Sequence, residues 1–295
     1  MKRALVFSLL LTMACGGDRH EAATDTAATS GSSNKPVTIK GSDTMVILGQ
    51  RFAEEYMKNN PAVVIQVNGG GSGTGIAALI NGTVDLAQSS RPMKEGEKGD
   101  VEKNRNAQLN ETPVALDALA VFVHSGNPVQ SLTIDQLSSI YTGKVTNWNQ
   151  VGGANAPIVL YGRENSSGTY EYFKEHVLGK ADFAPRTQTL QGTAAVINAV
   201  SRDKNGIGYG GIAYAQGVRP IGVKKDAASP AVLPTEENVV NGTYPIARHL
   251  YFYWISTARP ELEQFVQWAT SPEGQKLVEN VGYFPLADAP KTATQ

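Results

Sequence analysis

The stretch Arg163-Glu-Asn-Ser-Ser-Gly-Thr-Tyr170 follows a short apolar run at residues 158–161. From its end onward, Tyr170, Phe173 and Val177 recur at the spacing of one helix face. An apolar run, a turn rich in glycine and serine, and a periodic apolar face in this order predict a buried strand, a tight turn and a helix. The chain is therefore expected to contain the strand–turn–helix unit of an α/β protein.

The first turn of that helix has the composition of an anion-binding site. Ser167, Gly168 and Thr169 would lie where backbone N–H groups have no intrahelical partner, at the positive end of the helix dipole. Arg163, just before the turn, has a planar guanidinium that matches two oxygens of a phosphate-like group. Taken alone, this stretch is explained equally well by an ordinary Ser/Thr helix cap beside a solvated arginine.

Two other stretches repeat the pattern. Lys40-Gly-Ser-Asp-Thr44 follows a predicted strand at 36–39 and opens a predicted helix. Gly69-Gly-Gly-Ser-Gly-Thr-Gly75 lies between a predicted strand at 63–67 and a predicted helix at 76–80. All three turns combine glycine with serine or threonine, so each can present N–H and hydroxyl donors. Three such turns in one chain indicate that they converge on one small oxyanion.

Composition narrows the class of protein. The chain has 295 residues, of which 41% are hydrophobic and 18% charged, with a formal net charge of −1. This is ordinary globular composition, and the length is enough for two domains of usual size. Nucleic acid is not expected as the main partner, because the chain has no basic excess with which to neutralise a phosphate backbone.

The first 36 residues predict export and tethering. A basic start and an apolar run at 4–14 predict a secretory signal peptide over residues 1–15. Cys15 ends this segment and resembles the lipidated cysteine of a bacterial lipobox; a plain signal peptide with an incidental cysteine is the alternative. Residues 16–36 have almost no large apolar side chains and predict a flexible tether. We expect an envelope protein, periplasmic or on the extracytoplasmic face, that is lipid-anchored to the membrane.

Beyond the tether, strand and helix signals alternate, which predicts the α/β class. Two long strand-like runs, 112–124 and 244–255, can each serve two sheets in turn, so we place a crossing between two lobes in each. Lobe I is then expected at 37–117 plus 252–288, and lobe II at 118–251.

Polar residues also end another predicted strand of lobe I, where Ser90 and Arg91 follow its apolar part. Lobe I would hold this turn together with the turns at 41–44 and 71–75, whereas lobe II would hold the turn at 163–169. An anion bound by all four turns must lie in the cleft between the lobes. That arrangement supports hinge closure around a ligand.

These turns and several further stretches resemble the substrate-binding protein of bacterial phosphate ABC transporters, the PstS family. The motifs span nearly the whole mature chain, in the order KGSDTM, GGGSGTGI, QSSRPM, IYTGKVTNWNQVGG, GRENSSGTYEYF, GIGYGGIAYA, YPIARHLYFY and SPEGQKLVENVGYFPL. The resemblance implies a two-lobed type II periplasmic binding protein fold with a dehydrated inorganic phosphate in the interdomain cleft. It also implies delivery of that phosphate to the permease subunits of an ABC transporter.

The resemblance further implies which residues bind phosphate. Arg163 would carry the positive charge, and Ser167, Gly168 and Thr169 would donate from the helix terminus. The turns of lobe I would supply the remaining residues of the site: Ser42, Asp43, Thr44, Ser72, Ser90 and Arg91.

Arg91 departs from the pattern of the family. In some members an aspartate at this place accepts the proton of hydrogen phosphate and so rejects fully ionised sulfate. A selective site needs such an acceptor, because unpaired lone pairs facing each other cost several kcal/mol in a dry cleft. Asp43 is the candidate for that role. Arg91 would either add a second cation to the ligand or form a salt bridge with Asp43.

Other functions have less support in the sequence. Hydrolysis of phosphate esters would need a nucleophile or two metal ions, yet the chain has no Gly-x-Ser-x-Gly elbow and no histidine pair at metal-ligand spacing. We therefore expect a monomeric binding protein, not an enzyme, without cofactor or metal. The closer alternatives are a binding protein for another tetrahedral oxyanion, such as sulfate, molybdate or arsenate, and a phosphate-sensing envelope lipoprotein.

Overall fold

A computed structural model of the protein describes residues 35–286. The predicted signal peptide, the predicted lipidated Cys15 and nearly all of the predicted tether lie outside the described residues, as do positions 287 and 288 at the predicted end of lobe I. Within residues 35–286, no helix has both the length and the apolar character needed to cross a bilayer.

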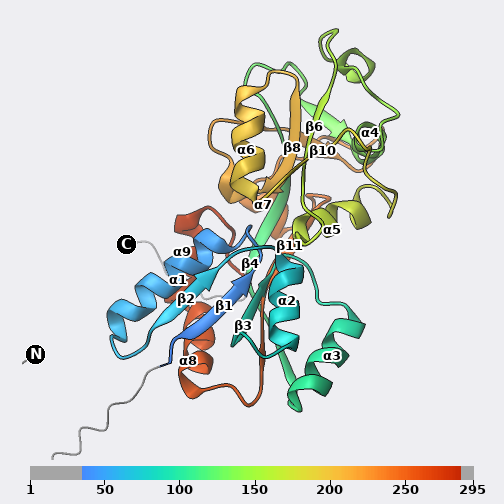
Figure 1. Cartoon of the computed structure of the whole chain (residues 1–295). Coiled ribbons are helices and arrows are strands. Elements are labelled where there is room, and N and C mark those ends of the chain that lie inside the picture. Colours follow the sequence, from blue (N-terminus) through green and yellow to red (C-terminus); the bar gives the residue numbers. More distant parts are fainter. Residues whose placement is uncertain (1–34, 287–295) are drawn as a thin grey trace, which may run out of the picture. The chain divides into compact units, whose positions relative to one another are not determined.

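Strands and helices alternate along the described chain, as expected for an α/β protein (Figure 1). The first half contains β1 (Val37–Gly41), α1 (Val46–Asn59), β2 (Ile65–Asn68), α2 (Ser72–Ile80), β3 (Leu86–Ser89), α3 (Glu95–Arg105), β4 (Leu109–Val123), β5 (Ser131–Thr133), α4 (Ile134–Tyr141) and η1 (Trp148–Val151). The second half contains β6 (Val159–Arg163), α5 (Gly168–His176), β7 (Gln188–Leu190), α6 (Thr193–Arg202), β8 (Gly206–Gly211), η2 (Ile212–Tyr214), β9 (Arg219–Pro220), β10 (Gly222–Lys224), α7 (Glu236–Val240), β11 (Ala247–Ile255), α8 (Pro260–Ala269) and α9 (Pro272–Val281).

The strand β4 joins two parts of one long sheet (Figure 1). Among the described strands the order is β2-β1-β3-β11-β4-β8-β6-β7, with β9 also paired to β4, while β5 and β10 form a separate pair. β4 pairs antiparallel with β11 from Leu109 to Ala118, and with β8 from Leu119 to Val123. Its 15 residues therefore serve two parts of the sheet in turn, as predicted for the run 112–124. The same prediction for the run 244–255 is wrong among the described strands, because β11 pairs with β3 and with the first part of β4 alone.

Parallel pairing sets the direction in which the strands point. β1 is parallel to β2 and to β3, and β6 is parallel to β7 and to β8. Parallel strands end at a common edge, where ligands of open α/β sheets usually bind. The turns that follow β1, β2, β3 and β6 therefore lie at sheet edges suited to form one site.

Buried apolar side chains form two main cores. In one, Phe252 of β11 packs against Phe52 of α1 and Phe265 of α8, with ring centroids 6.2 and 6.1 Å apart. In the other, Phe173 of α5 stacks on Tyr209 of β8 with centroids 4.1 Å apart. Each core buries the apolar stripe of its amphipathic helices. The residue boundaries of lobes I and II stay a prediction.

The structure corrects the sequence analysis at several local points. The helix expected at 76–80 begins earlier, at Ser72, because Gly71 at φ 91° turns the chain directly into it. Thr193 precedes an apolar helical pattern, which predicts a helix cap, but Gly192 at φ 79° turns the chain in the same way and Thr193 is the first helical residue of α6. The Asn-Trp-Asn sequence at 147–149 predicts a loop, yet it includes the start of η1. Residues 224–240 are loop-like in sequence, but they contain α7, which is capped by Thr235.

Candidate anion-binding site

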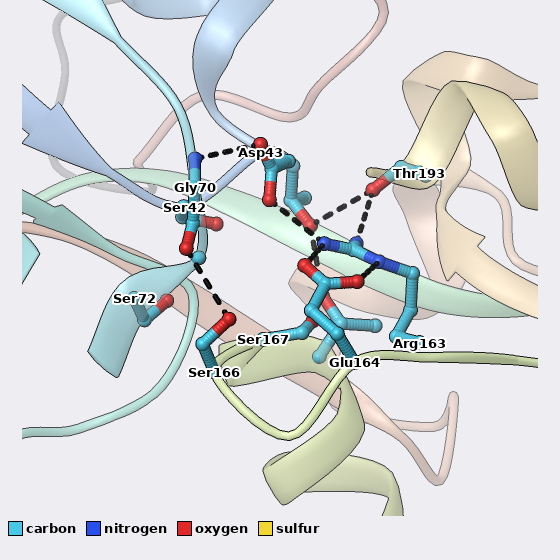
Figure 2. A network of polar contacts seen from close by, with 12 residues as sticks. Ser42, Asp43, Gly70, Ser72, Arg163, Glu164, Ser166, Ser167 and Thr193 are labelled. Carbon is cyan, nitrogen blue, oxygen red and sulfur yellow. Dashed lines mark hydrogen bonds and ion pairs between the residues drawn. The ribbon is translucent and has the colours of Figure 1, made fainter. Parts of the chain in front are cut away.

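Turns at the ends of several strands bring polar side chains into one buried cluster. They follow β1, β2, β3 and β6, and the start of α6 adds a further residue. Figure 2 shows residues from these turns facing one another: Ser42, Asp43, Gly70, Ser72, Arg163, Glu164, Ser166, Ser167 and Thr193. The structure thus brings together nine of the ten binding residues suggested by sequence: Ser42, Asp43, Thr44, Ser72, Ser90, Arg163, Ser167, Gly168 and Thr169.

Hydroxyl groups form a connected set at the centre of this cluster. The Ser42 hydroxyl donates to Ser90 Oγ at 2.8 Å, and Ser90 Oγ lies 3.4 Å from Ser72 Oγ. Thr169 Oγ1 lies 2.8 Å from Thr44 Oγ1 and 3.5 Å from Ser90 Oγ. All five side chains are buried. Hydroxyls from three turns of the predicted lobe I therefore meet the helix terminus that belongs to the predicted lobe II.

Two helices direct their N-termini at these hydroxyls. α2 begins at Ser72 and α5 at Gly168, and the amides of a first helical turn have no intrahelical acceptor. A Cβ on Gly168 would lie 2.3 Å from Ser72 Oγ and 2.9 Å from Ser90 Oγ, so glycine is what allows α5 to approach. The Ser167 hydroxyl accepts from the amide of Tyr170 and caps α5. The two helix dipoles therefore converge where an anion would be stabilised.

Arg163 is the buried cation of the cluster. Its Nε and Nη2 donate to the two carboxylate oxygens of Glu164 at 3.0 and 2.8 Å, and Nη2 also donates to Asp43 Oδ2 at 2.9 Å. Its Nη1 donates to Thr193 Oγ1 at 2.8 Å. Burial alone would raise the pKa of Glu164, but hydrogen bonds and charge from Arg163 outweigh it and hold the pKa below 4.5. The guanidinium is therefore held in a fixed plane from both sides (Figure 2).

Asp43 is held in place on both of its carboxylate oxygens. Oδ1 accepts from the Gly70 amide at 2.9 Å, while Oδ2 accepts from Arg163. The Tyr214 hydroxyl donates to the Asp43 backbone carbonyl at 2.7 Å. Burial, reinforced by the nearby Asp43 charge, raises the pKa of Tyr214 to about 12, so Tyr214 stays a neutral donor. Asp43 is only partly buried, and its carboxylate is fixed at the margin of the hydroxyl set.

Arg91 lies apart from the hydroxyl set. Its Nη1 and Nη2 each donate at 2.8 Å to Glu97 of α3, and its Nε contacts Glu171 of α5, which Lys94 also contacts. The alternative that Arg91 forms a salt bridge with Asp43 is wrong, because these two glutamates take up the Arg91 guanidinium and Arg163 pairs with Asp43. The other alternative, a direct contact between Arg91 and the ligand, stays a prediction.

Sequence reasoning missed two groups around Arg163. Glu164 fixes the guanidinium, and Thr193 accepts from it while lying 3.4 Å from Thr44 Oγ1. A signal for Thr193 was present, since Gly192-Thr193 repeats the Gly71-Ser72 arrangement of a glycine at positive φ followed by a first helical hydroxyl residue. Glu164 carried no comparable signal, because an acidic residue beside an arginine is common on protein surfaces.

Sequence reasoning also missed a buried ion pair on the long strands β4 and β11. Arg248 of β11 donates through Nε and Nη2 to Asp117 Oδ2 of β4, at 2.9 and 2.8 Å. Burial raises the pKa of Asp117, and the Arg248 guanidinium opposes that rise. Arg248 lies in the motif YPIARHLYFY, but only the fold shows that its side chain points toward the turns.

Further contacts join the turn before α2 to the turn before α5. The Gly73 amide donates to the Ser166 carbonyl at 2.9 Å, and the Ser166 hydroxyl donates to the Gly70 carbonyl at 3.3 Å (Figure 2). Gly71 also approaches closely, since a Cβ there would lie 2.4 Å from the Ser166 carbonyl oxygen. The turns of the two predicted lobes are therefore in direct contact.

The donor set decides what this site can do chemically. Hydroxyls, helix N-termini and the buried guanidinium of Arg163 all donate hydrogen bonds, and the Asp43 carboxylate is placed beside them as an acceptor. Among residues 35–286, no group of three or more His, Cys, Asp or Glu side chains is arranged to hold a metal ion. The arrangement suits a small tetrahedral oxyanion bound through dipoles and one cation.

Comparison with known proteins finds one matching family and relatives named for phosphate binding. The PBP superfamily domain matches residues 22–273. The phosphate-binding protein PstS of Pseudomonas aeruginosa is 39% identical over 83% of this chain and 81% of its own length. PstS of Bacillus subtilis is 30% identical over 95% of this chain and 91% of its own length.

Solved structures confirm the predicted α/β, type II binding protein fold. One is a Clostridium perfringens protein with bound phosphate, described as a phosphate ABC transporter substrate-binding protein; it is 31% identical, with a TM-score of 0.79, over 85% of this chain and 100% of that chain. Another is an ABC-type phosphate transport receptor from Vibrio cholerae, 30% identical with a TM-score of 0.69, over 85% of this chain and 100% of that chain. The chain therefore belongs to the PBP superfamily and, within it, to the PstS family of phosphate-binding proteins.

Proposed function

We propose that the protein binds inorganic phosphate in the cell envelope and delivers it to the permease of an ABC transporter for phosphate uptake. The observation that carries this proposal is the meeting of buried hydroxyls and helix N-termini from separate turns beside Arg163. The names of the relatives, all phosphate-binding proteins, support the same ligand.

The physical basis of binding is an exchange of hydrogen bonds. Thr44 and Thr169 now contact each other, as do Ser42 and Ser90. An anion seated among them replaces these neutral contacts with charge-assisted hydrogen bonds, which are about twice as strong. Because the cluster is buried, those bonds form where water does not compete with them.

Selectivity would depend on Asp43. The hydroxyl group of hydrogen phosphate can donate a hydrogen bond to this carboxylate. Sulfate is fully ionised at neutral pH and would face Asp43 with lone pairs alone. Arg163 is already opposed by two carboxylates, Asp43 and Glu164, so dipoles must balance most of the ligand's charge. A protonated oxyanion is therefore favoured over a sulfate ion, which is the reason to prefer phosphate over sulfate.

The proposal extends to the setting of the protein. Export by the predicted signal peptide and attachment through Cys15 would place it at the extracytoplasmic face of the membrane, where it would meet the permease subunits. We propose that it acts as a monomer that binds and releases phosphate without altering it. Direct contact of Arg91 with phosphate is not needed for this function.

Calorimetric titration of the mature protein, stripped of ligand, tests the function directly. Phosphate should bind tightly near neutral pH, and sulfate should give no heat of binding under the same conditions. Comparable binding of both anions would indicate general oxyanion capture. The absence of a binding heat with either anion would contradict the proposed function.

Removal of the buried cation tests the site. Arg163→Ala should weaken phosphate binding by at least about 100-fold, because it removes a charged donor and leaves Asp43 and Glu164 facing the anion. Arg186→Ala removes an exposed arginine that donates to the Val145 carbonyl and should bind like wild type. Near-normal affinity in Arg163→Ala would show that the site lies elsewhere.

A further inference from the structure

The ion pair of Arg248 and Asp117 lies on the two long neighbouring strands. The two residues face each other in the antiparallel register of β11 and β4, and both side chains are buried. Asp117 Oδ1 also accepts from the Ile212 amide at 3.1 Å. Asp117 is thus fixed on both oxygens by the fold, and it orients the guanidinium of Arg248.

The remaining N–H groups of Arg248 reach the anion cluster. Nη1 donates to the backbone carbonyl of Ser90 at 3.0 Å, and Nη2 donates to Thr169 Oγ1 at 3.0 Å. Ser90 follows β3 and Thr169 lies in the first turn of α5. A single side chain therefore holds parts of the site from both predicted lobes.

The direction of the contact with Thr169 has a chemical consequence. A guanidinium has no acceptor, so Thr169 Oγ1 must accept from Arg248 and cannot give its own hydrogen back. That hydrogen is left for the cluster, where Thr44 Oγ1 lies 2.8 Å away, or for an anion bound there. Accepting from a cation also polarises the hydroxyl and strengthens it as a donor.

Resting on the phosphate-binding function proposed above, we propose that Arg248 is a positioning residue that commits the Thr169 hydroxyl to donate to the bound anion. Asp117 serves it by fixing the guanidinium plane. Arg163 has the corresponding relation to Thr193, to which it donates at 2.8 Å. Two arginines would then each orient one threonine hydroxyl toward the same place.

A double-mutant cycle between Arg248 and Thr169 tests this role, with phosphate affinity as the readout. Arg248→Gln should lower affinity by about tenfold in the wild-type background. In a Thr169→Val background, where no hydroxyl remains to be oriented, the same change should lower affinity by less than about twofold. A purely structural role would give the same loss in both backgrounds, and that result would overturn the proposal.

Controls separate this test from loss of the fold. Arg219→Gln removes a partly buried arginine that contacts the carbonyls of Asn127 and Val129, and it should leave phosphate affinity unchanged. If Arg248→Gln does not fold, the double variant Asp117→Asn/Arg248→Gln replaces it in the same cycle. That variant keeps two neutral hydrogen-bonding side chains facing each other across the strands. If the wild-type protein binds no phosphate, the proposed function and this inference are both overturned. If it binds phosphate, but Arg248→Gln lowers affinity equally in the wild-type and Thr169→Val backgrounds, the inference alone is overturned.

Discussion

Asp43 shows how much of the site's chemistry depends on one side chain. Its carboxylate accepts from the Gly70 amide on one oxygen and from Arg163 on the other, so an asparagine, with a single acceptor oxygen, can keep one of these two contacts. Asp43→Asn should weaken phosphate binding and strengthen sulfate binding, because an amide no longer requires a proton on the ligand. We expect the ratio of the two affinities to narrow by at least about tenfold.

Paired titrations with phosphate and sulfate measure this ratio. Asp182→Asn, which changes an exposed aspartate that pairs with Lys174, is the matched control and should keep the wild-type ratio. If the ratio of phosphate to sulfate affinity is unchanged in Asp43→Asn, a group other than Asp43 accepts the hydrogen bond from the protonated ligand.

Glu164 links the site to acid stability. Its pKa is held below 4.5 in the folded protein, so its stabilising contribution is present above that pH and is lost as the pH falls through the folded-state pKa. Each unit of lowering is worth about 1.4 kcal/mol at neutral pH. Glu164→Gln should therefore flatten the fall in the free energy of unfolding on acidification.

Denaturant titrations between neutral and acidic pH check the effect of Glu164. Burial would raise the pKa of Glu97, but hydrogen bonds from Arg91 and Lys94 lower it. Glu97 therefore keeps part of the pH dependence of the free energy of unfolding in Glu164→Gln. Glu279→Gln changes an exposed residue and serves as the control. A pH profile of Glu164→Gln that overlays wild type would contradict the expectation.

At the scale of elements, the first turn of α5 makes a second contact across the predicted lobes. Glu171 contacts both Arg91, which follows β3, and Lys94, which precedes α3. These ion pairs are partly exposed, so salt should screen them. Glu171→Gln should lower phosphate affinity about threefold, and the affinity of the variant should fall less steeply with added sodium chloride than that of wild type.

Glu175→Gln is the matched control for Glu171. It lies one turn further along α5 and pairs with Lys180, a residue of the same predicted lobe. Its phosphate affinity and salt dependence should equal those of wild type. Equal salt slopes for Glu171→Gln and wild type would show that these ion pairs do not help to close the protein.

Local patterns were sufficient to predict several elements. Thr133 and Gln136 form a capping box at the start of α4, as their Thr-x-x-Gln spacing predicts, and Ser271 caps α9 as its Ser-Pro-Glu-Gly sequence indicates. The strand–turn–helix units around Thr44, Ser72 and Arg163 are present because apolar periodicity and glycine-rich turns specify them locally. The start of α2 was misplaced, because a glycine at positive φ can lead into a helix as well as end one.

Long-range pairing explains what local patterns could not reveal. Arg248 lies 79 positions from Thr169 and 131 from Asp117, and only the antiparallel register of β4 and β11 brings them together. The partners of Arg91 escape local patterns for a related reason, since the charge-rich sequence at 93–105 predicts a solvated helix. Its Glu97 instead turns inward to the arginine.

At the scale of the whole molecule, closure and ligand binding involve the same groups. The contact of Thr44 with Thr169 joins the two predicted lobes, and so does the contact of Arg163 with Asp43. The continuous strand β4 also joins the two parts of the sheet, since its two ends pair with different strands. A ligand that binds these groups therefore stabilises one arrangement of the described chain, and a change at either group alters affinity and closure together.

Phosphate should consequently raise the melting temperature, because it binds the folded state and not the unfolded chain. At 100 times the dissociation constant, the free energy of unfolding increases by about 2.7 kcal/mol. For a chain of this size that corresponds to a rise of about 5–10 °C. Thermal melts at increasing phosphate measure it, with sulfate at equal ionic strength as the control for general salt effects. Arg163→Ala should show at most a small phosphate-specific rise at the same phosphate concentration, because its affinity is at least about 100-fold lower. A rise of equal size in Arg163→Ala would mean that phosphate stabilises the protein from another place.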